Sequence, residues 1–415
     1  MGVDQDDKNN IVIKEKKKKF RMVETDEREL EQKLRAHRRK IVRRTLIVIV
    51  VILALFFGFY LYLATRTFTD YTALNTVERS DTAAAQFEEF DGNILKYSND
   101  GAFYTDKSDH MIWNQTYEMQ NPKVDICQGY LTIFDRGGTA VYILGTAVYI
   151  LNKDGMQGNI KTTMPISRVC VASQGTIAVL MREDTTSYLQ LYNKEGELLA
   201  SGELHQENSG YPITIALSDD AKKMAVSMLD IGEGKLQTTI AFYNFGSVGQ
   251  NEIDNIVASY TYSDEVFPQM EFLSSNRMVA FGDSSILLFE GTQKPKVTQK
   301  TTLDKQIKSV FYNTEYIGVV YNNEDSGNTR HVEVYDMKGK QVLSKDFDMD
   351  YSRISFLDNN EICVTSDVEC RIYSLYGVER FRYTFDRKLY RVMSGATQMN
   401  YTFILDGTTE KVRLK

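Results

Sequence analysis

A short phrase that recurs along the chain constrains its fold more than any other feature of the sequence. Four of the five prolines open this phrase, as in the segments PKVDIC and PITIAL. Each copy alternates in the period of a β-strand, and a proline at the start of a strand costs no ladder hydrogen bond. The copies begin at Pro122, Pro165, Pro212, Pro268, Gln306 and Tyr351, with a weaker one at Leu389. A strand that returns in this way indicates a repeat architecture.

The rest of each repeat is also strand-like. Each phrase is followed by a second apolar strand and by a third strand that ends in an aromatic or aliphatic residue and a glycine-bearing turn. The third strands are marked by Trp113, Leu151, Tyr192, Tyr243, Phe289, Tyr335, Tyr373 and Val412. These markers lie 38 to 51 residues apart, which is typical of the four-stranded blades of a β-propeller. We therefore predict an all-β domain over residues 84–415, folded as a β-propeller with eight blades or, as the alternative, seven.

A propeller must close between its first and last blades. The chain ends three residues after Val412, so the last repeat has no outer strand of its own. Residues 84–90, with the sequence AAQFEEF, form a spare strand-like segment ahead of the first repeat. We predict that this segment completes the last blade and that its deletion destabilises the whole domain.

An uncharged stretch precedes the repeats. It covers residues 45–65 between Arg44 and Arg66, and residues 46–63 read LIVIVVILALFFGFYLYL. At 1.5 Å per helical residue, this run is long enough to cross a bilayer core of about 30 Å. It is also longer than the apolar region of a cleaved signal peptide. The sequence therefore predicts a transmembrane signal-anchor helix, joined to the propeller by a linker at residues 66–83.

Residues 1–44 form a basic tail, partly helical by pattern, with a net charge of +6, which leaves −13 for the rest of the chain. The basic residues closest to the apolar stretch are Arg38, Arg39, Lys40, Arg43 and Arg44. Since basic residues favour the cytoplasmic side of a span, we predict a single-pass protein of the cell membrane with a cytoplasmic N-terminus and an extracytoplasmic propeller. The tail either binds anionic lipid or a cytoplasmic partner, or serves only to set the topology.

Two stretches of sequence resemble known families. The turn LSDDAKKMAVS, which begins at Leu217, resembles the S-P-D-G-K-x-L-A turn of TolB-like and WD-type propellers, with Asp219 in place of proline. Over nearly its full length, including WNQTYEMQNPKVDIC and AFYNFGSVGQN, the chain resembles a family of uncharacterised Firmicute proteins. These are single-span membrane proteins with a propeller-like outer region, catalogued as a domain of unknown function. The resemblance implies a Gram-positive cell envelope and transfers no functional residues.

The sequence shows no motif for catalysis or for metal binding. The three histidines beyond the apolar stretch lie far apart, and no G-x-S-x-G elbow or complete dinucleotide fingerprint occurs. Asp346, Asp348 and Asp350 have the first spacing of a calcium loop, but Tyr351 stands where the turn glycine belongs. The single tryptophan rules out the repeated docking motif of quinone-cofactor propellers. We predict no catalytic residue, no metal ligand and no cofactor.

All four cysteines lie in the predicted propeller. Cys127 and Cys170 occupy a position of the repeated phrase that is apolar in most other copies, so we expect them in the core. Cys363 and Cys370 face each other if a two-residue turn forms between them. A cross-strand disulfide is then the alternative to two free thiols.

The segment after Tyr243 is the richest candidate for a ligand site. Its aromatic and amide groups are able to stack on, and hydrogen-bond, a glycan or a peptide, although blade packing and turn formation explain them equally well. The candidate ligand residues are Tyr243, Asn244, Phe245, Gln250 and Asn251.

Residues 138–151 contain the heptapeptide GTAVYIL twice in tandem. An insertion of seven residues within a strand turns every later side chain to the opposite face. We therefore predict that one copy bulges or loops out, as the product of a duplication.

These observations favour three functions, in decreasing order. The first is a membrane-anchored scaffold that is not an enzyme and that binds the lipid bilayer and other envelope proteins. The second is a sensor that binds a wall glycan or peptide and signals through its single span. The third is an envelope hydrolase or lyase, for which no acid or base is singled out. Nucleic acid is not expected as a partner, because the propeller carries a net charge of −13.

Overall fold

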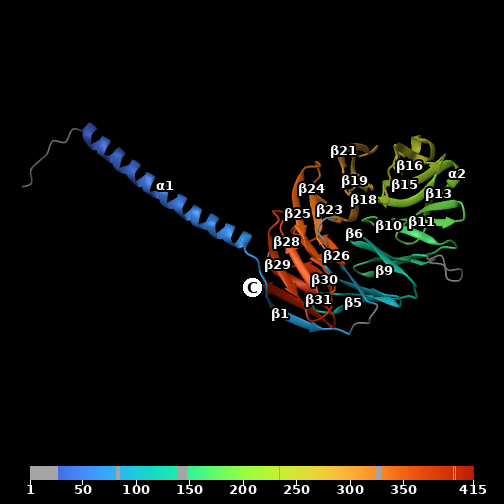
Figure 1. The fold of residues 1–415 in the computed structure, drawn as a ribbon, viewed down its shortest axis with the longest axis horizontal. Helices are drawn as coiled ribbons and strands as arrows, with labels where there is room; N and C mark the ends of the chain where they lie inside the picture. Colours follow the sequence, from blue (N-terminus) through green and yellow to red (C-terminus); the bar gives the residue numbers. More distant parts are fainter. Residues whose placement is uncertain are drawn as a thin grey trace, which may run out of the picture. The chain divides into compact units, whose positions relative to one another are not determined.

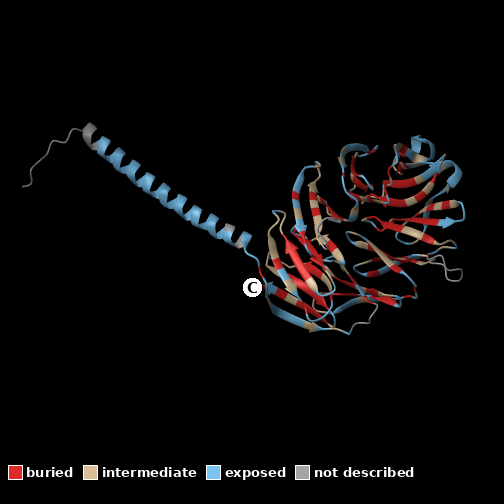
Figure 2. Ribbon diagram, in the orientation of Figure 1, coloured by how far each residue is buried: buried red, intermediate tan, exposed pale blue. Residues whose placement is uncertain are grey.

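The computed structural model describes residues 27–80, 85–137, 147–232, 234–322, 329–395, 397 and 399–415. The chain divides into two compact units, Met1–Ala64 and Thr65–Lys415. Helix α1 (Glu27–Thr65) accounts for the described part of the first unit and ends at the boundary. Its segment Glu31–Tyr60 is long and apolar enough to cross a membrane, and its described side chains are exposed (Figure 2).

The second unit contains eight antiparallel sheets of four strands each, so the predicted eight-bladed propeller is confirmed (Figure 1). Blade 1 comprises β2 (Gln86–Phe90), β3 (Asn93–Ser98), β4 (Gly101–Thr105) and β5 (Met111–Thr116). Blade 2 comprises β6 (Pro122–Cys127), β7 (Tyr130–Asp135), β8 (Ala147–Asn152) and β9 (Gly155–Lys161). Blade 3 comprises β10 (Ile166–Val171), β11 (Ile177–Glu183), β12 (Thr186–Tyr192) and β13 (Leu198–His205). Blade 4 comprises β14 (Tyr211–Leu217), β15 (Lys223–Gly232), β16 (Lys235–Asn244) and β17 (Ile256–Ser263).

The remaining four blades follow the same order. Blade 5 comprises β18 (Gln269–Ser274), β19 (Arg277–Phe281), β20 (Ser285–Glu290) and β21 (Lys296–Thr302). Blade 6 comprises β22 (Ile307–Tyr312), β23 (Tyr316–Asn322), β24 (Arg330–Asp336) and β25 (Gln341–Phe347). Blade 7 comprises β26 (Arg353–Phe356), β27 (Ile362–Thr365), β28 (Glu369–Tyr373) and β29 (Glu379–Thr384). Blade 8 comprises β30 (Leu389–Ser394), β31 (Asn400–Leu405), β32 (Thr408–Leu414) and β1 (Tyr71–Glu78). Three short helices, α2 (Gln206–Ser209), η1 (Gly249–Asn251) and η2 (Ile253–Asn255), lie in the connections.

The repeated phrase forms the first strand of every blade from blade 2 to blade 8. These first strands are the innermost ones, since β6, β10, β14 and β18 contact one another in series and β2 contacts β30. The alternating pattern of the phrase therefore predicted the innermost strands of blades 2 to 8, which surround the propeller axis.

The closing strand lies elsewhere than we predicted from the sequence. β1 pairs antiparallel with β32, from Tyr71↔Leu414 to Glu78↔Thr408, and in Figure 1 the blue β1 lies beside the red C-terminal strands. Residues 86–90 instead form β2, the innermost strand of blade 1, with Phe87 and Phe90 buried. The prediction for residues 84–90 was wrong because β2 is itself the eighth copy of the innermost strand, without the proline that marks other copies. The predicted linker at residues 66–83 contains β1.

The segment that leads into β1 is bonded to blade 7. Phe68, which is 2% exposed, donates its backbone N–H to the carbonyl of Arg380 at 2.8 Å and accepts the N–H of Arg382 at 3.1 Å. The hydroxyl of Thr67 donates to the carbonyl of Glu379 at 2.7 Å. Residues on the N-terminal side of β1 thus join blade 7 while β1 completes blade 8.

One marker of the third strands was also assigned to the wrong strand. Trp113 lies in β5, the outer strand of blade 1, directly opposite Tyr104 of β4. The two rings lie 5.3 Å apart between centroids, and the indole N–H donates to the carbonyl of Asn152 in blade 2 at 3.0 Å. The other seven markers lie in the third strands of their blades. Because opposed residues of neighbouring strands share one face, an aromatic residue by itself does not tell which strand carries it.

The core consists of apolar layers between successive blades (Figure 2). Between blades 4 and 5, for example, Phe242 and Phe289 are fully buried, with ring centroids 5.0 Å apart. Met270 and Met278 belong to the same cluster. Since strand side chains alternate between faces, each sheet contributes one face to each neighbour.

Deletion of one heptapeptide copy, residues 138–144, is expected to leave the propeller as stable as before. Residues 138–146 lie outside the described residues, whereas the second copy contributes Ala147–Leu151 to β8. The deletion keeps the sequence of β8 and leaves a β7–β8 hairpin loop of ordinary length. Thermal unfolding measures the result, and a marked loss of stability would contradict a simple duplication.

Candidate functional site

The predicted ligand residues differ in how far they are buried. Tyr243 and Asn244 end strand β16 and are buried, at 9% and 4% exposure. The amide of Asn244 donates to the carbonyl of Gln293 at 2.9 Å, while its oxygen accepts the N–H of Gly246 at 2.8 Å. The remaining predicted residues are Phe245, which is partly buried, and Gln250 and Asn251, which are exposed on η1. Packing and turn formation account for the two buried residues, and a ligand role stays a prediction.

The basic residues predicted to set the topology are part of α1. They are Arg38, Arg39, Lys40, Arg43 and Arg44, and all are exposed. Their role in orienting the chain stays a prediction.

Cys363 and Cys370 lie diagonally across a hairpin rather than opposite each other. The register pairs Thr365 with Cys370 and Cys363 with Ile372, so the two-residue turn that would place the cysteines opposite each other does not form. Both are buried free thiols with their sulfurs 4.0 Å apart, and burial raises the pKa of Cys370 well above its usual value. A disulfide here stays a prediction, and mass spectrometry of the protein from native membranes, with free thiols blocked first, tests it: two blocked thiols would contradict it.

The aspartates with calcium-loop spacing each face a basic or histidine side chain. Asp346 lies beside His331, Asp348 accepts a hydrogen bond from Arg371, and Asp350 is 3.6 Å from Arg330. The hydrogen bond from Arg371 lowers the pKa of Asp348. Among the residues that the structure describes, no group of three or more His, Cys, Asp or Glu side chains is placed to hold a metal ion.

The structure shows a polar cluster on blade 6 that the sequence did not predict. Nδ1 of His331 lies 2.6 Å from a carboxylate oxygen of Asp346, and Nε2 lies 3.1 Å from the hydroxyl of Ser344. The order Ser–His–Asp is that of a nucleophilic relay. Glu333, however, lies 3.4 Å from the same Nε2, and the Asp346 side chain is 58% exposed on an outer strand. We therefore assign no reaction to this cluster, whose signal in the sequence is the i, i+2 spacing of Ser344 and Asp346.

Charged side chains line the innermost strands on the side of blades 2 to 6. Asp125 of β6 accepts the N–H of Val171 at 2.8 Å, and Glu271 of β18 accepts the hydroxyl of Tyr312 at 2.9 Å. Burial raises the pKa of Asp125. Burial, helped by the Asp125 carboxylate and opposed by Arg168, raises the pKa of Glu271 to about 7. The two carboxylates thus disfavour each other's charge, with Arg168 as their counter-ion.

The substitution Glu271→Gln is expected to stabilise the protein at pH 8 and not at pH 4. The native carboxyl group holds its proton up to about pH 7, whereas an unfolded glutamate loses it near 4.5. Between these values the native state binds more protons, so stability falls as pH rises. Since the site is partly solvated, we expect a gain of about 2 kcal/mol above pH 7. Urea unfolding at both pH values measures it, and equal effects at the two would contradict it.

A second charged network joins the blades that close the ring. Glu88 of β2 accepts hydrogen bonds from Arg353 of β26 and from Arg391 of β30. These three strands belong to blades 1, 7 and 8. Burial lowers the pKa of Arg391, and the Glu88 carboxylate opposes that shift. The carboxylate thus lies between two arginines from the opposite end of the chain.

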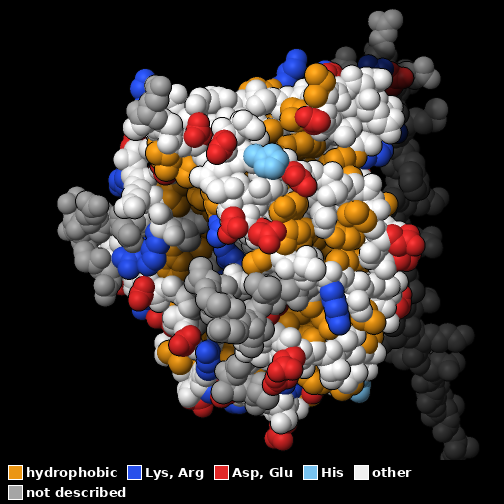
Figure 3. All heavy atoms as spheres, turned by 90° about the vertical axis from the view of Figure 1, so that its right-hand side faces the viewer, with side chains coloured by type: hydrophobic (Ala, Val, Ile, Leu, Met, Phe, Trp, Pro, Cys, Tyr) orange, Lys and Arg blue, Asp and Glu red, His pale blue; other side chains and the backbone are white. Residues whose placement is uncertain are grey.

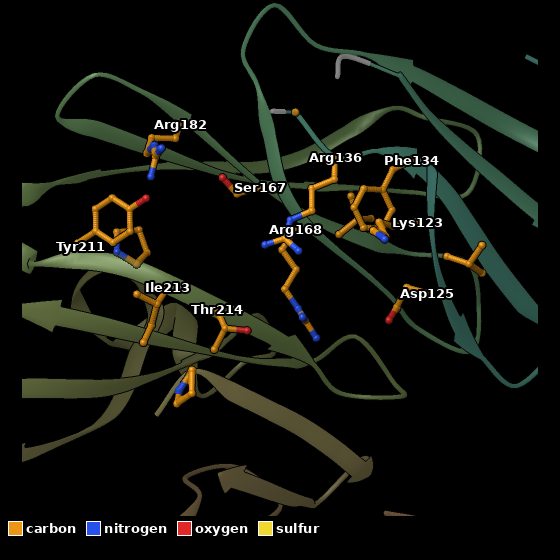
Figure 4. Close-up of a pocket in the computed structure, with 15 residues that line it drawn as sticks. Lys123, Asp125, Phe134, Arg136, Ser167, Arg168, Arg182, Tyr211, Ile213 and Thr214 are labelled. Atoms are coloured by element: carbon orange, nitrogen blue, oxygen red, sulfur yellow. The ribbon is translucent and has the colours of Figure 1, made fainter. Parts of the chain in front are cut away.

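A cavity of about 460 Å³ opens beside the first network, where the innermost strands of blades 2, 3 and 4 begin (Figure 4). Four basic side chains and one carboxylate line it, together with Phe134, Tyr211, Pro212 and Pro268. The charged residues are Lys123, Asp125, Arg136, Arg168 and Arg182. They come from β6, β10, β11 and the connection after β7, which only the ring brings together.

Local backbone irregularities shape this cavity. β10 and β14 each carry a β-bulge near their first residues, between Ile166 and Arg168 and between Pro212 and Thr214. A bulge leaves one residue unpaired and re-aims its neighbours. The unpaired residues, Ser167 and Ile213, both line the cavity. The repeated proline phrase predicted these strands but not the bulges.

Comparisons with known proteins identify a family for this chain. A comparison with curated proteins finds no match. Among solved structures, the chain is similar to BamB from Moraxella catarrhalis, at 11% identity and a TM-score of 0.43, over 83% of this chain and 100% of that one. It is similar to the WD40 domain of Pan2 from Neurospora crassa, at 9% identity and a TM-score of 0.40, over 84% and 98% of the two chains. Hydrazine synthase from Kuenenia stuttgartiensis matches at 10% identity and a TM-score of 0.45, over 72% and 94%. At these identities and TM-scores the likeness carries no argument about this chain.

The sequence pattern shared by one protein family matches residues 64–414 of this chain. These residues span the propeller from the end of α1 to the last residue of β32. That family is described as a family of unknown function, DUF5711. A match over this length covers every blade, including the closing strand β1. The chain therefore belongs to the family of unknown function DUF5711.

Proposed function

We propose that this protein is a membrane-anchored, extracytoplasmic β-propeller that serves as a protein-binding scaffold in the cell envelope. The observation that carries the proposal is the order of its parts along the chain. The apolar helix α1 ends at Thr65, and Thr67 and Phe68 already bond to β29 of a closed ring. A closed propeller ring on a membrane anchor is suited to presenting its loop faces to other proteins.

The charge distribution supports the proposed orientation. Basic residues precede the apolar helix, and the propeller side of the chain carries a net charge of −13. Basic residues close to a span favour the cytoplasm, so the propeller faces outward. Figure 3 shows acidic, basic and apolar side chains interspersed on one face of the propeller, which suits specific protein contacts better than a surface of one charge.

The sensor alternative gains support from the cavity beside Arg168. A site for a small ligand on the propeller, joined to a single helix with a basic tail, provides the parts that such a sensor needs. We do not propose an enzyme, because the scaffold role uses loop faces and needs no catalytic group.

Crosslinking in intact cells tests the scaffold role. The full chain is crosslinked, captured and examined by mass spectrometry for crosslinked peptides. We expect one or two envelope proteins at near-equal amounts, linked to propeller loops and lost when those loops are substituted. Recovery of the protein alone would contradict the scaffold.

Exchange of residues 1–65 for an unrelated anchor of the same orientation separates the two roles. A scaffold keeps its crosslinked partners and its cellular effect after the exchange. A sensor keeps ligand binding by the propeller but loses its effect, because the signal must pass through the native helix and tail.

A further inference from the structure

Basic side chains converge on the cavity between blades 2 and 5, although the propeller as a whole is acidic. Arg136 and Arg182 lie at its exposed rim, and Lys123 and Arg168 lie partly buried within it (Figure 4). Among the described residues, Lys123, Arg136 and Arg182 form no ion pair with a carboxylate, whereas Arg168 is the nearby counter-ion of Asp125 and Glu271. Residues 138–146, next to the lining residue Gly137, contain no charged side chain and so bring no counter-charge. Four cations of like sign in one cavity repel one another unless an anion joins them.

The carboxylate in the cavity does not balance them. Asp125 is the one acidic residue among the described lining residues, and one of its oxygens already accepts the N–H of Val171. Arg168 lies near both Asp125 and Glu271. Lys123 and the two rim arginines are left to face the open volume.

Two polar atoms of the lining are buried without a hydrogen-bond partner among the described residues. They are Nε of Arg168 and the hydroxyl oxygen of Thr214, a residue that is 1% exposed. Since neither atom has exposed area, both lie in the wall of the cavity rather than facing its open volume, and they leave that wall polar. The guanidinium of Arg182 stacks on the ring of Tyr211 at 5.0 Å, which holds one cation at the rim.

We propose that this cavity binds a small organic anion that carries at least two negative charges on carboxylate or phosphate groups. The arginines bind such groups through paired N–H donors, and Lys123 adds a point charge. Phe134, Tyr211 and the two prolines contact the apolar part of the ligand. The inference does not rest on the scaffold role, because it concerns only the propeller.

The size and charge of the surroundings set the ligand class. A volume of about 460 Å³ lies in the range of small-molecule sites, which is roughly 300–1,000 Å³. The net charge of −13 on the propeller repels long polyanions from a distance, whereas a small anion inside the cavity meets mainly the local cations.

Calorimetric titration of the full-length protein in detergent tests the proposal. The probes are inorganic pyrophosphate and citrate, at matched ionic strength. We expect saturable binding of at least one probe with a stoichiometry of one. Binding of pyrophosphate alone assigns a phosphate ligand, and binding of citrate alone assigns a carboxylate ligand. Absence of saturable binding for both probes overturns the proposal.

Matched variants locate the binding site. Lys123→Gln combined with Arg182→Gln removes two cations at partly exposed positions, so the fold is expected to hold, and we expect the affinity to fall by about tenfold or more. Lys296→Gln removes an exposed lysine from the outer strand β21 and is expected to leave the affinity unchanged. Equal affinities in the double variant and the wild type overturn the proposal. Arg168→Gln tests the deeper cation where thermal unfolding shows that the variant is folded.

Discussion

Deletion of residues 71–78 is expected to unfold the whole propeller rather than to remove one edge of it. β1 pairs with β32 at seven register positions and so completes blade 8. The ring of Tyr71 packs against that of Phe403 at 5.2 Å, and its hydroxyl donates to Glu410 at 3.2 Å. Without β1, the edge of β32 is open and the two ends of the chain no longer hold each other. We expect a loss of several kcal/mol, a large share of the 5–15 kcal/mol typical of folded proteins.

Thermal and urea unfolding of the full-length variant measure this loss. Removal of residues 138–144 takes out a similar number of residues and provides the control, with an expected melting temperature close to that of the wild type. A variant without residues 71–78 that unfolds at the wild-type temperature would show that closure by β1 contributes little. Deletion of residues 84–90 is also expected to destabilise the domain, because β2 is the innermost strand of blade 1.

Replacement of Glu88 by alanine is expected to weaken the same closure from the inside. Its carboxylate lies between Arg353 and Arg391, and its side chain is 22% exposed. The change leaves two arginines close together without their counter-ion. Breaking a buried ion pair costs about 3–5 kcal/mol, and partial exposure reduces this, so we expect a loss of about 2 kcal/mol.

A surface pair of the same chemistry provides the control. Arg277 and Glu290 pair at 2.7 Å across β19 and β20, with side chains 36% and 40% exposed. Glu290→Ala is expected to cost about 0.5 kcal/mol. Urea unfolding compares the two variants at low salt and at high salt. If Glu88→Ala costs no more than Glu290→Ala, the network does not contribute to closure.

The blade count and the innermost strands of blades 2 to 8 could be predicted from the sequence. The phrases at Pro122, Pro165, Pro212 and Pro268 became β6, β10, β14 and β18 because alternation and proline position act within a few residues. The apolar stretch at residues 45–65 likewise became part of one helix, α1. Such signals are local, so they predict these strands and this helix without knowledge of which strands pair.

Pairings between distant segments could not be predicted in the same way. Residues 71–78 and 84–90 both have strand-like sequences, and either is able to reach the last blade. The choice between them depends on which segment blade 1 requires as its innermost strand. Tyr71 packs against Phe403, although more than three hundred residues separate them in the sequence. No local pattern predicts such a contact.

The cavity that forms the candidate site could not be predicted from the sequence, for a related reason. Lys123 and Arg168 stand at different positions of the repeated phrase, while Arg136 and Arg182 lie outside it. Each reads as an ordinary surface cation when taken alone. Their shared cavity lies where β10 and β14 carry bulges and where the innermost strands of blades 2, 3 and 4 begin.

The sequence by itself determined the repeated strands, the number of blades and the apolar helix, because hydrophobic period and turn chemistry act between near neighbours. Only the tertiary structure decided which strand closes the ring and which charges share the cavity. Those features depend on contacts between blades, which form only when the whole ring is assembled.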